Sequence, residues 1–67
     1  MIEVGERIEI LRDNLQCALV RSGEVFFVEK VNFRRRFIQI QAPIDGRPSY
    51  MFGLEMENIG WKKILLT

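Results

Sequence analysis

The sequence contains one cysteine and no histidine. A single cysteine excludes a disulfide within the chain, and the missing histidine removes the commonest general base of enzymes and a usual zinc ligand. Cys17 lacks the histidine partner that activates a cysteine nucleophile, so its expected role is that of a small packing residue. No glycine-rich phosphate-binding loop is present. The sequence therefore predicts a protein that is not an enzyme and that uses no cofactor or metal.

Long apolar runs and a large excess of charge of one sign are also missing. No apolar segment approaches the roughly 20 residues that span a bilayer, and the N-terminus alternates acidic and apolar residues, unlike a signal peptide. Ten basic and nine acidic residues leave a net charge of +1, far from the balance of a dedicated nucleic-acid binder. A lone thiol without an export signal predicts a cytoplasmic location.

Apolar residues are plentiful enough for one small core. They make up 48% of the 67 residues, so residues 1–67 are expected to fold as a single domain. A domain of this size buries only about 60% of the surface of its unfolded chain. Without disulfides or metal, it must gain its stability from a dense core or from self-association.

Five segments have the composition and the alternation of β-strands. A first strand is expected at residues 2–11, with a bend or bulge at Gly5. Its buried face would consist of Ile2, Val4, Ile8 and Ile10. The other strands are expected at residues 24–33, 37–42, 49–54 and 60–66. A single 3-10 turn at residues 55–58 is expected before the last strand.

The second of these strands is apolar on both faces. Phe26 and Val28 share one parity, and Val25 and Phe27 share the other. Two explanations stay open: a long bent strand can serve two sheets of a small barrel, or Phe26 and Val28 face a partner. Three aromatic side chains are expected in the core, namely Phe27, Phe52 and Trp61.

The order of these elements, together with VGERIEI at residues 4–10 and SGEV at residues 22–25, resembles the SH3-like barrels. In size it resembles the short ones among bacterial and phage accessory proteins. The resemblance implies an all-β, five-stranded SH3-like barrel with one 3-10 turn before the last strand. The Ala-Leu-Tyr-Asp-Tyr opening and the acidic loop of peptide-binding SH3 domains are absent. Recognition of proline-rich peptides is therefore not implied.

A second resemblance involves VGE at residues 4–6 and IQIQAP at residues 38–43. These segments are similar to the carbon storage regulator family of small RNA-binding dimers, in which a strand ends in Asn-Ala-Pro. Here Gln41 stands before Ala42, the intervening segment is longer, and a strand is expected where that family has a helix.

Three consecutive arginines form the only candidate site. Arg34, Arg35 and Arg36 are expected at the tip of the hairpin between the second and third strands. Their guanidinium groups match phosphate or carboxylate, and Phe33 and Phe37 on either side suit stacking on bases. The alternative is that the arginines solvate a turn and pair with Glu29, Glu55 or Glu57.

The sequence favours a small non-catalytic binding module that contacts a protein partner or itself, in an accessory or inhibitory role. It has more apolar side chains than one barrel interior holds, the surplus being Phe26, Val28, Leu15, Leu19, Met51 and Leu65. One alternative is nucleic-acid binding through the three arginines, Arg47 and Lys62–Lys63. Because the net charge of the chain is close to zero, such binding is expected to be weak at physiological salt. Another is capture of an anionic, nucleotide-like ligand between subunits. The candidate binding residues are Arg34, Arg35, Arg36, Arg47, Phe26, Val28 and Tyr50.

Overall fold

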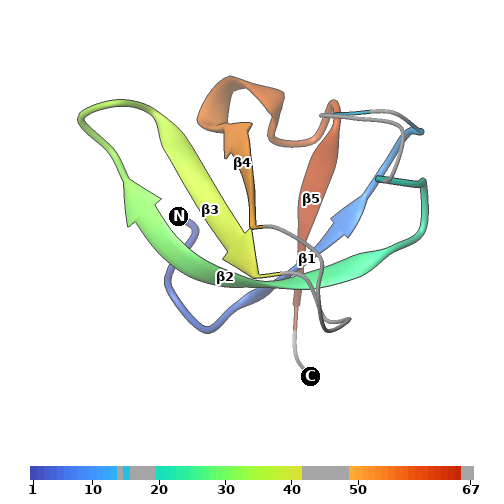
Figure 1. Ribbon diagram of the computed structural model, residues 1–67, viewed down its shortest axis with the longest axis horizontal. Coiled ribbons are helices and arrows are strands. Elements are labelled where there is room, and N and C mark those ends of the chain that lie inside the picture. Colours follow the sequence, from blue (N-terminus) through green and yellow to red (C-terminus); the bar gives the residue numbers. More distant parts are fainter. Residues whose placement is uncertain (14, 16–19, 42–48, 66–67) are drawn as a thin grey trace.

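The computed structural model describes residues 1–13, 15, 20–41 and 49–65. Within them, five antiparallel strands form one sheet in the order β4-β3-β2-β1-β5 (Figure 1). The strands are β1 (Arg7–Ile10), β2 (Val25–Asn32), β3 (Phe37–Gln41), β4 (Tyr50–Gly53) and β5 (Trp61–Ile64). The prediction of an all-β fold with five strands is confirmed.

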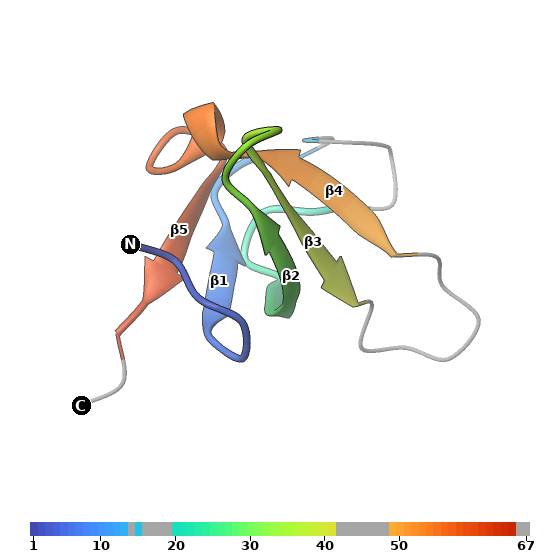
Figure 2. The same ribbon diagram turned by 90° about the vertical axis from the view of Figure 1, so that its left-hand side faces the viewer.

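The sheet is bent but not closed. Its end strands β4 and β5 are joined by a 3-10 helix, η1 (Leu54–Met56), and no pairing between them occurs in the described residues. Figure 2 shows the two strands diverging from the end of the sheet where η1 lies. The predicted 3-10 turn before the last strand is confirmed, although it begins one residue earlier than expected.

The first strand is shorter than the alternation indicated, because the chain turns before it. Gly5 has φ +90°, and the N–H of Glu6 donates to the carbonyl of Glu3 (3.2 Å). The predicted bend at Gly5 is thus a turn, and β1 begins only at Arg7. Ile2 still reaches the core, whereas Val4 is exposed, so the expectation of Val4 on a buried face is wrong.

The bend of the sheet is located in β2. This strand pairs with β1 through residues 25–27 and with β3 through residues 27–32, with a register shift between Val28 and Lys30. A bulge of this kind adds one residue to one strand and increases its twist and bend. As Figure 1 shows, β2 curves from β1 at one end to β3 at the other. The predicted bend of β2 is confirmed, but it lies within a single sheet and does not bury both apolar faces, because Val25 and Phe27 remain exposed.

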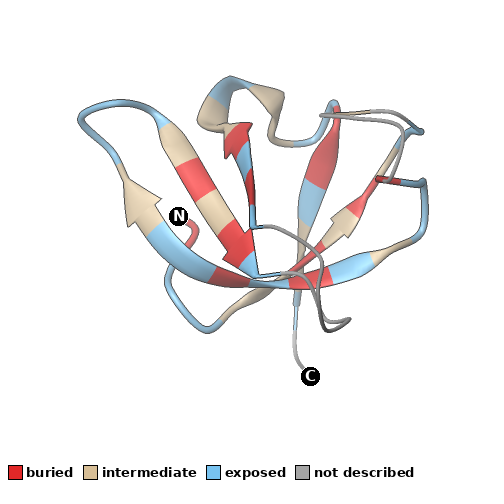
Figure 3. Ribbon diagram, viewed as in Figure 1, coloured by how far each residue is buried: buried red, intermediate tan, exposed pale blue. Residues whose placement is uncertain are grey.

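The core lies on the concave face of the bent sheet. Buried residues alternate with more exposed ones along β2, β3 and β4 (Figure 3). Phe26 is 1% exposed and Val28 is 2% exposed, so the alternative in which they face a partner is wrong. The predicted core positions of Phe52 and Trp61 are confirmed. The prediction for Phe27 is wrong, because it is 59% exposed.

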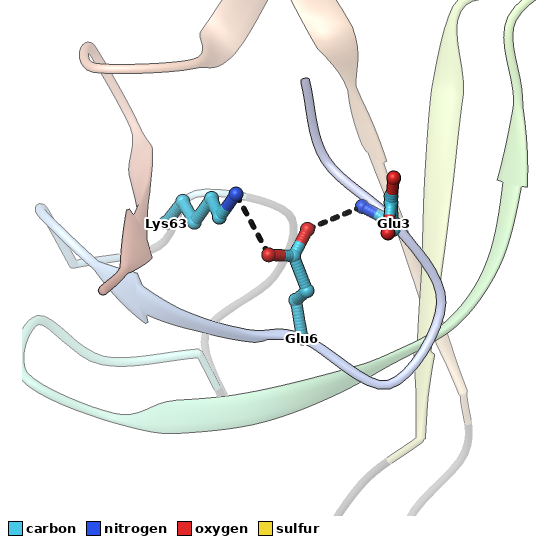
Figure 4. Close-up of polar contacts among 3 residues, drawn as sticks. All are labelled: Glu3, Glu6 and Lys63. Atoms are coloured by element: carbon cyan, nitrogen blue, oxygen red, sulfur yellow. Dashed lines mark hydrogen bonds and ion pairs between the residues drawn. The ribbon is translucent and has the colours of Figure 1, made fainter. Parts of the chain in front are cut away.

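Lys63 on β5 forms an ion pair with Glu6, just before β1 (2.7 Å between Nζ and Oε2; Figure 4). The N–H of Glu3 donates to the other carboxylate oxygen of Glu6 (2.6 Å). The hydrogen bond from Lys63 lowers the pKa of Glu6 below its ordinary value of 4.5. The same hydrogen bond raises the pKa of Lys63 above 10.5. The pair therefore links the N-terminal turn to the last strand in its charged form.

A Glu6→Gln substitution tests the contribution of this pair. A lowered carboxylate pKa stabilises the fold above the ordinary pKa of 4.5, and this stabilisation is lost as pH falls through the folded-state value. Thermal melts from pH 7 to about pH 3 should therefore show a steeper decline for the wild type than for Glu6→Gln. Glu9→Gln is the matched control, since Glu9 lies farther from its partner Lys62 (3.9 Å). Parallel melting curves for wild type and Glu6→Gln would contradict the assignment.

Candidate functional site

The three arginines lie in the turn between β2 and β3, as predicted. Asn32 pairs with Phe37 at the end of the ladder, and residues 33–36 make the turn. All three arginine residues are exposed. The Oδ1 of Asn32 accepts a hydrogen bond from the N–H of Arg35 (2.9 Å), and the carbonyl of Arg36 accepts one from the N–H of Leu54 (2.9 Å). We call residues 32–37 the arginine turn.

The backbone of Arg36 has a left-handed conformation, with φ +61°. This region suits glycine and, to a lesser degree, asparagine, and it is unfavourable for other residues. Asn58, the other described non-glycine residue with positive φ (+65°), belongs to the tolerated type. Arg36 is therefore a residue that local backbone preference disfavours, held in place by the hydrogen bonds on both sides of the turn.

The arginine side chains have no carboxylate partner in the part of the chain that the structure describes. The ion pairs there are those of Lys62 with Glu9 and of Lys63 with Glu6, between β5 and the β1 region. The alternative that the arginines pair with Glu29, Glu55 or Glu57 is therefore not observed. Their guanidinium groups present uncompensated positive charge at one end of the β2–β3 hairpin.

A second surface lies on the face of the sheet that points away from the core, which we call the outer face. Residues directly opposite one another in a ladder share a face. Phe27 of β2 pairs with Arg7 of β1 and with Gln41 of β3, and Arg7 pairs in turn with Ile64 of β5. Val25 lies two residues before Phe27 and is also exposed. Phe27, Val25 and the half-buried Ile64, with Arg7 between them, form what we call the apolar patch.

Charged residues border the apolar patch on one side. Val25 pairs with Glu9, and Glu9 pairs with Lys62, so both signs of charge lie next to the apolar side chains. This surface was not predicted from the sequence, because Phe27 was expected in the core. The sequence carried no local signal for this surface, because β2 is apolar on both parities and only the register shows that Arg7 and Gln41 are the neighbours of Phe27.

The structure does not bring the remaining candidate residues to these surfaces. Tyr50 is only 5% exposed and packs edge-on against Phe26, with ring centroids 6.3 Å apart. Phe26, Val28 and Tyr50 are thus core residues and are not accessible to a partner or a ligand. Arg47, Cys17 and Leu19 lie outside the described residues. Among the surplus apolar residues, Met51 and Leu65 are exposed, and Leu15 packs against the core.

A pocket that could hold a nucleotide-like ligand is not found in the part of the chain that the structure describes, nor is a cluster of metal-ligating side chains. The same residues include no helix long and apolar enough to cross a membrane.

Comparisons with protein-family models, with curated proteins and with solved structures found no match for this chain. The candidate site therefore consists of two open surfaces, the apolar patch and the arginine turn.

Proposed function

We propose that this protein is a small non-catalytic binding module of the SH3-like barrel type that contacts proteins, including a second copy of itself, through the apolar patch. Three features support the barrel type. The strands follow the order β4-β3-β2-β1-β5, β2 bends to pair with strands on both sides, and a 3-10 helix lies between β4 and β5. An accessory or inhibitory role fits a module that binds its partner without catalysing a reaction on it.

The exposure of Phe27 is the observation that carries this proposal. Complete burial of a phenylalanine side chain contributes about 1.5–3 kcal/mol relative to exposure, and Phe27 is 59% exposed. Much of that free energy is available to a partner. Aromatic and arginine side chains are also the types that most often dominate binding energy at protein interfaces, and Arg7 lies directly opposite Phe27.

The charges beside the patch favour self-association as one form of this contact. In a twofold dimer each surface meets a copy of itself, so a patch carrying both signs of charge can place unlike charges together. Arg7, Glu9 and Lys62 supply both signs. A small domain without disulfides also gains stability when it buries additional apolar surface in a dimer.

A Phe27→Glu substitution tests the proposed interface. Placing a carboxylate in the centre of the patch should weaken self-association or partner binding by roughly 30-fold or more, because a central aromatic residue contributes about 2 kcal/mol or more. Self-association is measured by sedimentation velocity from about 1 to about 100 µM protein. Partner binding is measured by quantitative affinity capture with the wild type and the variant.

Met51→Glu is the matched control for this experiment. Met51 is similarly exposed, at 52%, but lies on the edge strand β4, two strands away from Phe27. It should behave as the wild type in both measurements. The proposal fails if the wild type is monomeric throughout and if Phe27→Glu captures the same proteins, in the same amounts, as Met51→Glu.

A further inference from the structure

We propose that the arginine turn binds the phosphate backbone of single-stranded nucleic acid, while Phe33 stacks on a base. This site lies at the end of the β2–β3 hairpin and differs from the apolar patch. It goes beyond the proposed protein contacts and does not depend on them. The charge of the turn, an exposed aromatic ring beside it and the fixed shape of its backbone support this assignment.

The arginine turn is complementary in charge to a phosphate backbone. Arg34, Arg35 and Arg36 are adjacent and exposed, and none has an ion-pair partner within the described ranges. A guanidinium group offers a planar set of donors that matches the oxygens of a phosphate. Three such groups at one tip can contact successive phosphates of a flexible strand.

The aromatic ring indicates that the strand is unpaired. Phe33 begins the turn and is 52% exposed. An exposed ring beside basic groups can stack on a base of any sequence, provided that the base is not already stacked in a duplex. Single-stranded RNA or DNA is therefore favoured over duplex.

Polar residues of the outer face extend this surface away from the turn. Lys30 pairs with Gln39, and Asn32 pairs with Phe37, so ammonium and amide groups follow the arginines along the hairpin. These groups can donate hydrogen bonds to phosphates or to base edges. Beyond them, Glu29 at the bulge marks where the positive surface ends.

The turn is already held in one shape before a ligand binds. The hydrogen bonds from Arg35 to Asn32 and from Leu54 to Arg36 fix both halves of its backbone. A preformed site loses less conformational entropy on binding than a flexible loop does. Arg36 places a third cation in the turn at a left-handed backbone position that favours glycine.

The test is fluorescence anisotropy with labelled oligothymidine and oligouridine of about twelve nucleotides. Affinity is measured between about 50 and 200 mM salt. Contact with three phosphates predicts that the logarithm of the binding constant falls with the logarithm of salt concentration with a slope of about −2. Replacing all three arginines with glutamine should remove most of this slope. Phe33→Ala should weaken binding by roughly 5- to 150-fold and leave the slope unchanged.

Two further variants separate binding from folding. Arg36→Gly should reduce the magnitude of the slope by about 0.7, while its melting temperature equals or exceeds that of the wild type, because glycine relieves the backbone at φ +61°. Arg21→Gln is the matched control. It removes an exposed arginine that precedes the other end of β2, and it should keep the wild-type slope.

Several outcomes would overturn the proposal. One is an unchanged affinity and slope in the triple arginine variant. Another is an affinity of Phe33→Ala equal to that of the wild type. A third is equal affinity of the wild type for a duplex of the same length. Either of these two results would show that Phe33 does not stack on a base. Binding to phosphatidylserine vesicles without any binding to the oligonucleotides would assign the turn to a membrane surface instead. Phe27→Ala should bind the oligonucleotides as the wild type does, so a failure of the apolar patch is distinguishable from a failure of this site.

Discussion

Replacing Trp61 with alanine is expected to remove about 3–5 kcal/mol of stability, which is comparable to the whole free energy of unfolding of a domain this small. Trp61 is completely buried and begins β5, directly opposite Ile10 of β1. Its indole N–H donates to the carbonyl of Gly53 at the end of β4 (3.0 Å). Since β4 and β5 are not paired in the described residues, this ring is a principal connection between the two ends of the open sheet.

Chemical denaturation followed by far-ultraviolet circular dichroism measures this loss. Trp61→Phe separates the packing of the side chain from its hydrogen bond. Phenylalanine keeps most of the ring but leaves the Gly53 carbonyl without the indole donor, which should cost about 1–3 kcal/mol of stability. Ile59→Ala, at an exposed position two residues earlier, is the control and should change stability by less than about 1 kcal/mol. A Trp61→Ala variant as stable as Ile59→Ala would show that the described core is wrong.

The second large effect distinguishes two adjacent phenylalanines of β2. Phe26→Ala should lose about 3–5 kcal/mol of stability, because Phe26 is buried against Tyr50 with the rings nearly perpendicular (78°). Phe27→Ala should lose less than about 1 kcal/mol, since its ring lies on the outer face. The two variants delete the same atoms one residue apart, so the difference between them measures which face of β2 is buried.

The same pair of variants reports on binding. Phe27→Ala should retain the fold and weaken the protein contacts proposed for the apolar patch. The measurement is the midpoint of urea unfolding for stability and sedimentation velocity or affinity capture for binding. Equal destabilisation of the monomer by Phe26→Ala and Phe27→Ala, measured at a concentration too low for self-association, would mean that β2 presents no outer face to solvent. That result would remove the basis of the proposed interface.

Much of the fold could be predicted from the sequence because most strands have one apolar parity. In β3, Ile38 and Ile40 alternate with Gln39 and Gln41, and the structure buries the first pair and directs the second outward. The arginine turn was predicted for a similarly local reason. Three charged residues between two apolar segments cannot be buried without partners, so they mark a surface turn.

The apolar patch could not be predicted in this way. The strand β2 is apolar on both parities, so its alternation alone does not identify its inner face. That choice is made by register: Val28 pairs with Ile40 and joins the core, whereas Phe27 pairs with Arg7 and Gln41. Tyr50 was misassigned as a ligand contact although it shares its parity with the predicted core residue Phe52, and its pairing with the buried Ile40 directs it into the core.

The sequence by itself determined that this chain is all-β, where its strands lie, and that three arginines occupy an exposed turn. These properties depend on side-chain period and turn chemistry, which act over a few neighbouring residues. Only the tertiary structure decided that Phe26 is buried and Phe27 exposed, and that the sheet bends at the bulge in β2 without closing. The physical reason is that register and burial are set by pairing between strands distant in sequence, and a shift of one residue exchanges the two faces of a strand.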